Sequence, residues 1–177
     1  MGKLSMQELN RPTIEVFKKE EKFPIVLVLD NIRSMNNVGS AFRTADAFKV
    51  QKIYLGGITA TPPHKDITKT ALGADESVNW EHGANVLEIV ETLKKEGYII
   101  CAIEQAKEST MLNKFIPKHT EKYAFVFGNE VFGVADEVLN SADICLEIPQ
   151  FGTKHSLNIS VTLGIVCWDY VSKSLNF

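Results

Sequence analysis

Three short loops in the last third of the sequence combine glycine with polar side chains and could bind a ligand. They are Gly128-Asn129-Glu130, residues 148–152 and Ser156-Leu157-Asn158. The first two adjoin apolar runs typical of buried strands, and the third precedes a mostly apolar helical segment. Polar loops at the carboxyl ends of buried strands form the ligand site of an open α/β sheet. This spacing therefore predicts one binding site built by segments distant in sequence.

The positions of the glycines indicate the kind of ligand. Glycine allows the backbone to approach a ligand closely. A dinucleotide or phosphate cradle places its glycines directly after the first strand, but the chain has no glycine between its first apolar run, residues 23–30, and Gly39. A ligand held mainly by backbone groups of late loops would be flat and lightly phosphorylated, such as an adenosine. Taken singly, each glycine is also explained by an ordinary turn.

Apolar runs alternate with segments of helical periodicity along most of the chain. The expected strands cover residues 23–30, 52–55, 98–103, 123–127 and 144–148. One helix is expected to begin at Asn36 or Asn37, and the last helix is expected to begin near Ser156. Three further helices are expected at residues 69–74, 85–95 and 134–140. This alternation predicts an α/β fold whose mostly parallel sheet has helices on both faces.

The N-terminal residues 1–22 are expected to form a helical extension of a single domain that covers residues 1–177. Ser5 and Glu8 have the spacing of a capping box, and Pro12 either limits that helix or opens a second one that runs to about Glu20. No internal repeat or linker divides the chain, and its 45% hydrophobic content is enough for one full core.

Charge and cysteine content limit the classes of function. The formal net charge of -3 does not by itself favour nucleic acid, which usually selects a basic excess. The three cysteines lie scattered in apolar runs, as expected for reduced thiols in a cytoplasmic protein. Cysteine and histidine show no metal-ligand spacing, so we expect no metal site. The apolar runs are too short to span a bilayer, so we expect no membrane partner.

Taken in order, the polar segments resemble the motifs of a known family, the SpoU (TrmH-like) branch of the SPOUT RNA methyltransferases. The matching motifs are Asn31 with Asn36-Asn37, Gly39 and residues 43–48; residues 127–130 with Gly133; and Ile148-Pro149 with Gly152 and residues 156–161. The resemblance covers roughly residues 24–171. Each motif is weak alone, but three motifs at compatible spacing on the expected strand ends are specific.

The resemblance implies a fold, a cofactor and a reaction. The fold would carry a deep C-terminal trefoil knot at about residues 123–171, a rare exception to the rule against threaded loops. The knot loops would hold S-adenosyl-L-methionine, and a homodimer with paired knots would build the site. The reaction would be methyl transfer to a ribose 2'-hydroxyl of RNA. The chain lacks the separate N-terminal RNA-binding domain of larger ribosomal RNA members, which favours tRNA over rRNA.

The family's catalytic roles fall on Arg43, Asn37, Glu130, Ser156 and Asn158. Guanidinium keeps its proton in proteins, so we expect Arg43 to clamp the phosphate beside the target ribose and lower the pKa of the hydroxyl. An ion pair with Asp46 on the same helix is the alternative. Asn37 would fix the arginine or the RNA, or only cap its helix. Glu130 would lie beside the cofactor loop at the dimer interface, or merely open the following helix.

Ser156 and Asn158, which belong to the third of these motifs, would hydrogen-bond near the ribose, the cofactor or the arginine. Ser156 could also cap the last helix. Backbone groups at Gly128, Ile148 and Leu157 would face the adenine and ribose. The full set of expected cofactor-binding residues is Gly128, Asn129, Ile148, Gln150, Gly152, Ser156 and Leu157.

The chain departs from the family pattern at Met35, Val131 and Gln150, where proline, glycine and methionine are common. Val131 and Gln150 would line the pocket, so they bear on cofactor affinity. Three alternatives stay open: an rRNA 2'-O-methyltransferase, a non-catalytic RNA-binding factor with the same fold, and a hydrolase or nucleotidyl transferase acting on adenosine nucleotides. The missing phosphate-cradling loop and the absence of clustered carboxylates for Mg²⁺ disfavour the last.

Overall fold

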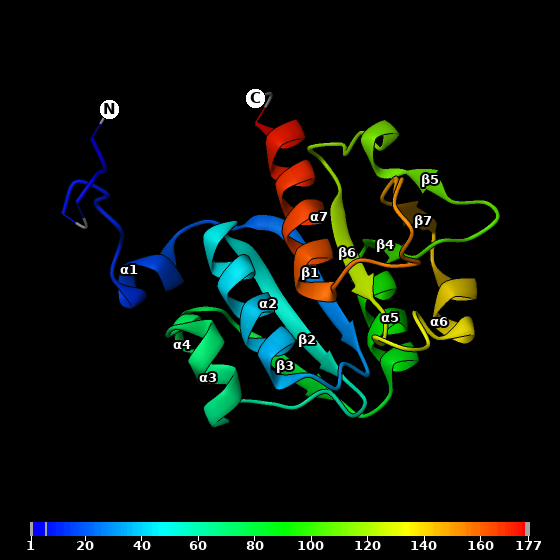
Figure 1. Cartoon of the computed structure of the whole chain (residues 1–177), viewed down its shortest axis with the longest axis horizontal. Coiled ribbons are helices and arrows are strands. Elements are labelled where there is room, and N and C mark those ends of the chain that lie inside the picture. The colour runs from blue at the N-terminus through cyan, green and yellow to red at the C-terminus, as the bar shows by residue number, and fades with distance from the viewer. Residues whose placement is uncertain (1, 6, 176–177) are drawn as a thin grey trace.

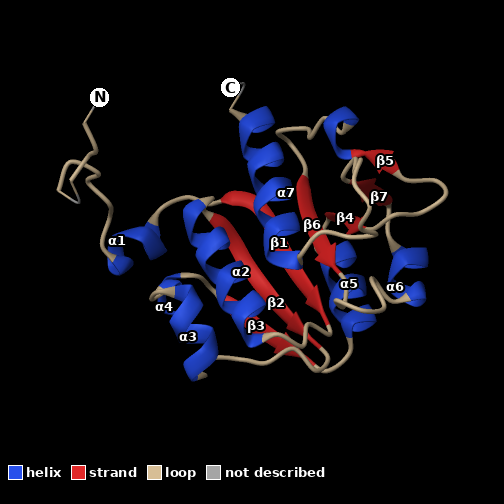
Figure 2. Ribbon diagram, viewed as in Figure 1, coloured by secondary structure: helices blue, strands red, loops and turns tan. Residues whose placement is uncertain are grey.

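The computed structural model describes residues 2–5 and 7–175, and its centre is one seven-stranded sheet (Figures 1 and 2). Every strand pairing in it is parallel. The strand order is β3-β2-β1-β6-β4-β7-β5. The strands are β1 (Phe23–Asp30), β2 (Val50–Gly56), β3 (Trp80–Gly83), β4 (Tyr98–Ile103), β5 (Thr110–Met111), β6 (Lys122–Phe127) and β7 (Ile144–Glu147).

Helices cover both faces of the sheet, as the alternating pattern predicts. One face carries α2 (Met35–Ala47), α3 (Lys65–Ala71) and α7 (Ile159–Ser174), and Figure 1 shows α2 and α7 in front of the strands. The other face carries α5 (Val86–Lys95) and α6 (Asp136–Ser141). Three short helices, α1 (Ile14–Lys19), α4 (Ala74–Ser77) and a 3₁₀ turn at Leu112–Lys114, complete the fold.

The continuous apolar run of β1 is explained by burial on both sides. Leu27 and Leu29 face the cluster that includes α2 and α7, whereas Val26 and Val28 face the cluster that includes α5 and α6. All four side chains are almost completely buried. Successive side chains of a strand point to opposite faces, so the interior positions of a central strand of this sheet must be apolar.

The order of the strands decides which loops meet. The chain passes from β1 outward through β2 to β3, then crosses to β4, and later inserts β6 between β1 and β4. The strands run parallel, so the loops after β1, β4, β6 and β7 share one edge of the sheet, beside the point where the direction of winding reverses. Ligands of open α/β sheets bind at such an edge.

Two helix starts differ from the expected ones. Ser34 caps α2 by accepting a hydrogen bond from the amide of Asn37, so Asn36 and Asn37 lie inside the first turn. Asn158, and not Ser156, caps α7 by accepting from the amide of Ser160 at 2.8 Å. Ser34 has the extended backbone that a cap requires, which leaves the side chain of Asn37 free for another contact.

The bounds of other helices and strands also differ from the predicted ones. The helix expected at 69–74 is instead α3, which ends where Leu72 and Gly73 adopt positive φ values of 52° and 89°. The helix α6 begins at Asp136 and not at 134. The two short edge strands β3 and β5 were not predicted, because two to four mixed residues carry no clear alternation.

The N-terminal extension is less helical than expected. Ser5 and Glu8 do form the reciprocal hydrogen bonds of a capping box, but a turn follows in place of a helix, and Thr13 caps the helix α1 that comes after Pro12. The predicted extension also includes Met1 and Met6, which lie outside the described residues. Within the described chain no helix is long and apolar enough to cross a bilayer.

The C-terminal part returns to the middle of the molecule. After β7 the chain runs through a loop into α7, which packs against α2 over the front of the sheet (Figure 1). The threading of this path as a trefoil knot over residues 123–171 stays a prediction from the family resemblance.

Candidate active site

A pocket of about 570 Å³ opens at the carboxyl ends of β4, β6 and β7 and at the start of α7. It has the size of small-molecule sites in proteins. All but one of the residues expected to bind a cofactor line it, namely Gly128, Asn129, Ile148, Gln150, Ser156 and Leu157. Gly152 lies outside the lining, on an exposed loop. The sequence therefore located the pocket through the loops that form its walls.

The loop after β6 is folded tightly at its two glycines. Asn129 and Gly133 exchange backbone hydrogen bonds of 2.9 Å in both directions. A side chain at Gly128 would collide with the backbone of Gly133 and Val134. Gly133 itself has a φ of 72°, in the region that favours glycine. These glycines are therefore required by the loop, which presents its backbone to the pocket.

Asn129 fixes this loop from within and from the neighbouring strand. Its side-chain oxygen accepts hydrogen bonds from the amides of Val131 and Phe132, at 2.9 and 3.2 Å. Its side-chain nitrogen donates to the carbonyl of Asn31, after β1, at 2.7 Å. The side chain of Asn129 thus connects the loop after β6 to the segment after β1, so the first two motifs of the resemblance lie side by side.

Glu130 points from the pocket wall toward the start of α2. Its carboxylate accepts hydrogen bonds from the amides of Arg33 and Ser34, both at 3.2 Å, and from the side-chain nitrogen of Asn37 at 3.1 Å. Burial raises the pKa of Glu130, but hydrogen bonds led by the one from Arg33 outweigh burial, and the pKa is lowered. Glu130 is therefore ionised at neutral pH, and it anchors the loop after β6 to the start of α2. The alternative role, opening the helix that follows Glu130 in the sequence, is not the contact that the structure shows.

Asn158 completes a relay between the three motifs. Its side-chain nitrogen donates to the side-chain oxygen of Asn37 at 3.5 Å, and Asn37 in turn donates to Glu130. The side-chain oxygen of Asn158 accepts from the amide and hydroxyl of Ser160. Three of the five residues expected to be catalytic are thus in contact with one another.

Arg43 lies apart from this relay. It is exposed and lines a separate groove of about 490 Å³ together with Lys69 and Ser160. Among the described residues it makes no hydrogen bond or ion pair. The alternative Arg43–Asp46 ion pair is not present among the described residues, and Asp46 accepts a hydrogen bond from the hydroxyl of Ser77 at 2.5 Å. The groove and the pocket adjoin at the start of α7, where Asn158 lines the pocket and Ser160 the groove.

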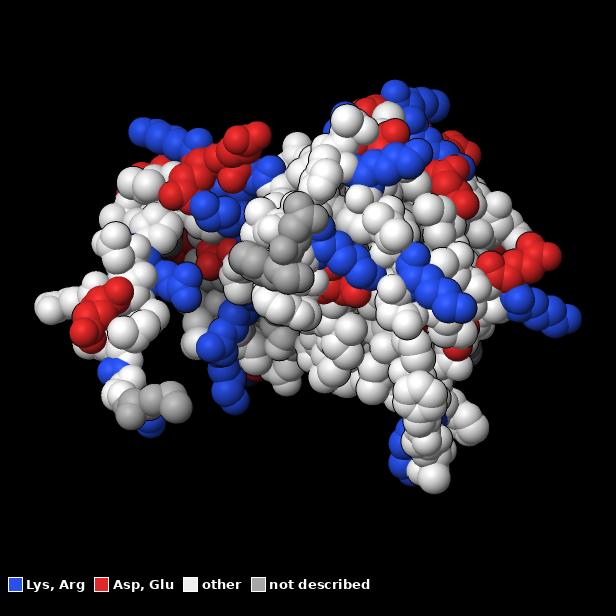
Figure 3. Space-filling model, turned by 90° about the horizontal axis from the view of Figure 1, so that it is seen from above, with Lys and Arg blue, Asp and Glu red and all other residues white. Residues whose placement is uncertain are grey.

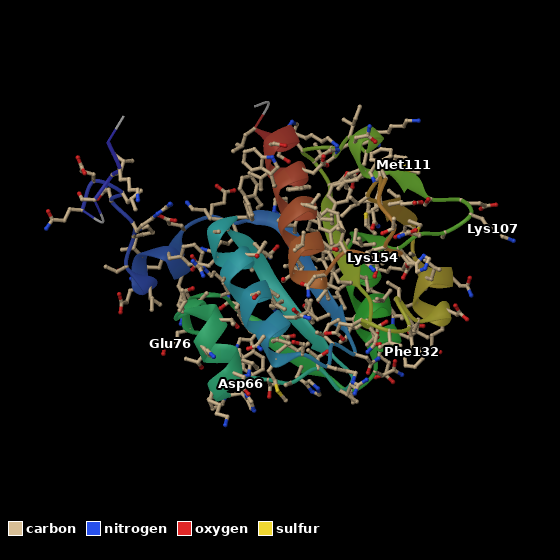
Figure 4. All side chains as sticks on the ribbon, in the orientation of Figure 1. Asp66, Glu76, Lys107, Met111, Phe132 and Lys154 are labelled. Carbon is tan, nitrogen blue, oxygen red and sulfur yellow. The ribbon has the colours of Figure 1, made fainter. Side chains whose placement is uncertain are left out.

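Ser156 lines the pocket on the exposed segment between β7 and α7. Figure 4 shows Lys154 on the same segment and Phe132 on the loop after β6. This segment is attached to the rest of the site by the side chain of Gln105, which donates to the carbonyl of His155 at 2.6 Å.

Sequence reasoning missed Glu104, Gln105 and Glu147, which also line the pocket. Glu104-Gln105 directly follows the apolar run of β4, the same signal that identified the other loops, but without a glycine to mark it. No three His, Cys, Asp or Glu side chains gather as a possible metal site in the described part of the chain.

Comparisons with known proteins identify relatives of this chain. The model of the SpoU rRNA Methylase family matches residues 24–168. The 23S rRNA (guanosine-2'-O-)-methyltransferase of Neisseria meningitidis serogroup B is 30% identical over 86% of this chain, which spans only 60% of that relative. A tRNA (guanosine(18)-2'-O)-methyltransferase of Borreliella burgdorferi is 28% identical over 84% of this chain and 66% of its own length.

Solved structures show the same fold. The structure of the TrmH/SpoU tRNA modifying enzyme of A. aeolicus superposes with a TM-score of 0.80 and 28% identity, covering 92% of this chain and 81% of the other. The two chains therefore share their overall fold over most of their length.

Proposed function

The chain belongs to the SpoU rRNA methylase family, and from this premise we propose that it is an RNA ribose 2'-O-methyltransferase that uses S-adenosyl-L-methionine. The observation that carries the proposal is the relay from Asn158 through Asn37 to Glu130. It joins all three motif segments beside a pocket walled by loop backbone.

The pocket suits the proposed cofactor in shape and charge. Gly128, Ile148 and Leu157 line it and would present backbone groups to an adenosine. The described lining contains three carboxylates, from Glu104, Glu130 and Glu147, and no lysine or arginine. Carboxylates favour a cation nearby, and the cofactor carries a sulfonium and an ammonium group. When bound, S-adenosyl-L-methionine supplies an electrophilic methyl group.

The adjoining groove suits RNA. Arg43 and Lys69 line it, and its described lining contains hydroxyl groups but no acidic side chain. Figure 3 shows lysine and arginine mixed with acidic residues over the face seen from above, so RNA contact on that face would be local and not a broad basic surface. The opposite charges of groove and pocket match a polyanion on one side and a cationic methyl donor on the other.

In the reaction, Arg43 would bind the phosphate beside the target ribose through two parallel hydrogen bonds. The positive charge lowers the pKa of the 2'-hydroxyl and stabilises the developing oxyanion. Guanidinium holds its own proton, so the phosphate or a water takes the proton. Ser156 and Asn158, at the junction of groove and pocket, would align the ribose for in-line attack, and such alignment supplies much of the rate.

We propose a homodimer because apolar side chains remain exposed around the site. Val161 and Trp168 on α7, Phe132 after β6 and Phe151 after β7 are all about half exposed or more. Large apolar patches on a protein surface mark interaction sites. A second copy packed across α7 would cover them, and it would lie close to both the groove and the pocket, which meet at the start of α7.

We propose tRNA as the substrate and rRNA as the second candidate. The relative from Borreliella burgdorferi and the enzyme from A. aeolicus are both named for tRNA. The relative from Neisseria meningitidis is named for 23S rRNA and keeps the second candidate open.

The decisive experiment is methyl transfer from radiolabelled S-adenosyl-L-methionine into bulk tRNA and, separately, into rRNA that lacks ribose methylation. Digestion should release a labelled 2'-O-methyl nucleoside from the tRNA. Label only in rRNA would select the second substrate. Cofactor binding with no label in either pool would favour a non-catalytic RNA-binding factor.

A further inference from the structure

The two residues after β4 occupy a special place in the sheet. Strand β4 lies between β6 and β7. Its last residue, Ile103, pairs with Phe127 at the end of β6 and with Leu146 near the end of β7. The next residues, Glu104 and Gln105, therefore lie between the loops that follow those two strands, and these loops form two walls of the pocket.

Each polar group of Glu104, in its backbone and in its side chain, makes a hydrogen bond to a neighbouring residue. Its amide donates to the carbonyl of Leu146 at 3.1 Å, and its carbonyl accepts a weak hydrogen bond from the thiol of Cys145. One carboxylate oxygen accepts from the amide of Gln105 at 2.8 Å, and the other accepts from the amide of Val134 at 3.0 Å. The last bond holds the loop after β6. A side chain at Gly133 would collide with this carboxylate, so the loop leaves room for Glu104.

Gln105 holds the other wall. Its side-chain nitrogen donates to the carbonyl of His155 at 2.6 Å. Residues 151–157 belong to no helix or strand and are all exposed. Within the described chain this is the one hydrogen bond that attaches them to the rest of the site. Ser156 and Leu157, which follow directly, are pocket residues.

We propose that Glu104 and Gln105 are a pair of positioning residues that hold the two cofactor loops in their binding arrangement before the cofactor arrives. Glu104 holds the wall at 129–134, and Gln105 holds the wall at 151–157. Ordering a loop costs binding free energy, so a loop already held raises affinity. This inference rests on the proposed cofactor site and assigns to the pair a role in affinity, with the methyl-transfer chemistry left to Arg43 and the relay.

The test compares Glu104→Gln and Gln105→Ala with the control Glu108→Gln, whose exposed side chain makes no hydrogen bond to any described residue. Two local measurements are made without cofactor. Gln105→Ala should speed tryptic cleavage after Lys154 several-fold and leave the hydrogen exchange of Val134 unchanged. Glu104→Gln should speed exchange at Val134 and leave the cleavage rate unchanged. The control should alter neither.

Calorimetric titration with S-adenosyl-L-methionine then measures affinity. Gln105→Ala, which leaves the charge of the pocket unchanged, should raise Kd by about five-fold, the usual effect of losing one hydrogen bond. Glu104→Gln should raise Kd by at least as much, because it also removes one of the carboxylates that line the pocket. In both variants kcat at saturating cofactor should fall much less. Unchanged local rates would show that the pair does not hold the loops. Changed local rates with an unchanged Kd would overturn the link to affinity. If the unaltered protein binds no cofactor, the proposed function fails, and the local rates still decide whether the pair holds the loops.

Discussion

The side chains of Asn37 and Asn158 meet at 3.5 Å, which joins the first turn of α2 to the cap of α7. Each asparagine has a second contact on the other side. Asn37 donates to Glu130, and Asn158 accepts from Ser160. The relay therefore depends on both helices beginning where they do, and the capping roles of Ser34 and Asn158 are part of the site.

Replacing Asn158 with alanine should reduce methyl transfer by about 100-fold or more, because it removes the cap of α7 and breaks the relay. Stability should fall by about 1 kcal/mol, the usual effect of losing a cap. Asn85→Ala is the matched control, since Asn85 caps α5 by accepting from the amides of Leu87 and Glu88, outside both the pocket and the groove. Equal losses of transfer in the two variants, measured beside thermal unfolding, would reduce Asn158 to a structural cap.

Arg43→Ala should abolish methyl transfer with little change in cofactor affinity, because Arg43 lines the groove and not the pocket. Arg43→Lys should restore only a small part of the rate, since lysine keeps the charge but not the two parallel hydrogen bonds. Lys95→Ala, on an exposed position of α5, is the control for loss of one positive charge. Full activity of the lysine variant would show that charge alone suffices.

Two inactive variants should complement each other if two copies build each site. Leu157→Arg places a cation in the pocket and should block the cofactor, whereas Arg43→Ala leaves the pocket intact. Mixed and reannealed, they should recover about a quarter of the normal activity, because about half of the dimers are mixed and each has one complete site. Absence of recovery, with mixed dimers demonstrated by mass spectrometry, would assign Arg43 to the pocket of its own chain.

Glu130 should make the stability of the fold depend on pH in the acid range. Its pKa is lowered in the folded protein from the ordinary value of 4.5. A lowered carboxylate pKa contributes stability that is present above the unfolded value and is lost as pH falls through the folded value. The difference in unfolding free energy between the unaltered protein and Glu130→Gln should therefore be constant from neutral pH down to about 5 and then shrink. A difference that grows on acidification would contradict the lowered pKa.

The sheet and the loops were predictable because each rests on a local signal. The apolar runs that became β1, β4, β6 and β7 are long enough to identify, and glycine-containing loops follow β6 and β7. In contrast, Trp80–Gly83 pairs with β2 only in the folded sheet and has no alternating pattern of its own.

The relations within the site were less predictable, because they depend on which strands become neighbours. By residue type, Asn36 and Asn37 could cap α2 as well as Ser34 could. Only the folded structure shows that the side chain of Asn37 bonds to Glu130 while Ser34 caps the helix. The importance of Glu104 and Gln105 follows from the place of β4 between β6 and β7, which no local pattern encodes.

The late insertion of β6 between β1 and β4 has a consequence for how the protein acquires activity. Asn129 bonds to Asn31 across 98 residues, and Asn158 bonds to Asn37 across 121 residues. Contacts of such long range form slowly, because the intervening chain must be closed into a loop first. During synthesis, the segment with Arg43 leaves the ribosome long before the segments that complete the pocket. Cofactor affinity should therefore arise abruptly, only after α7 has emerged and docked.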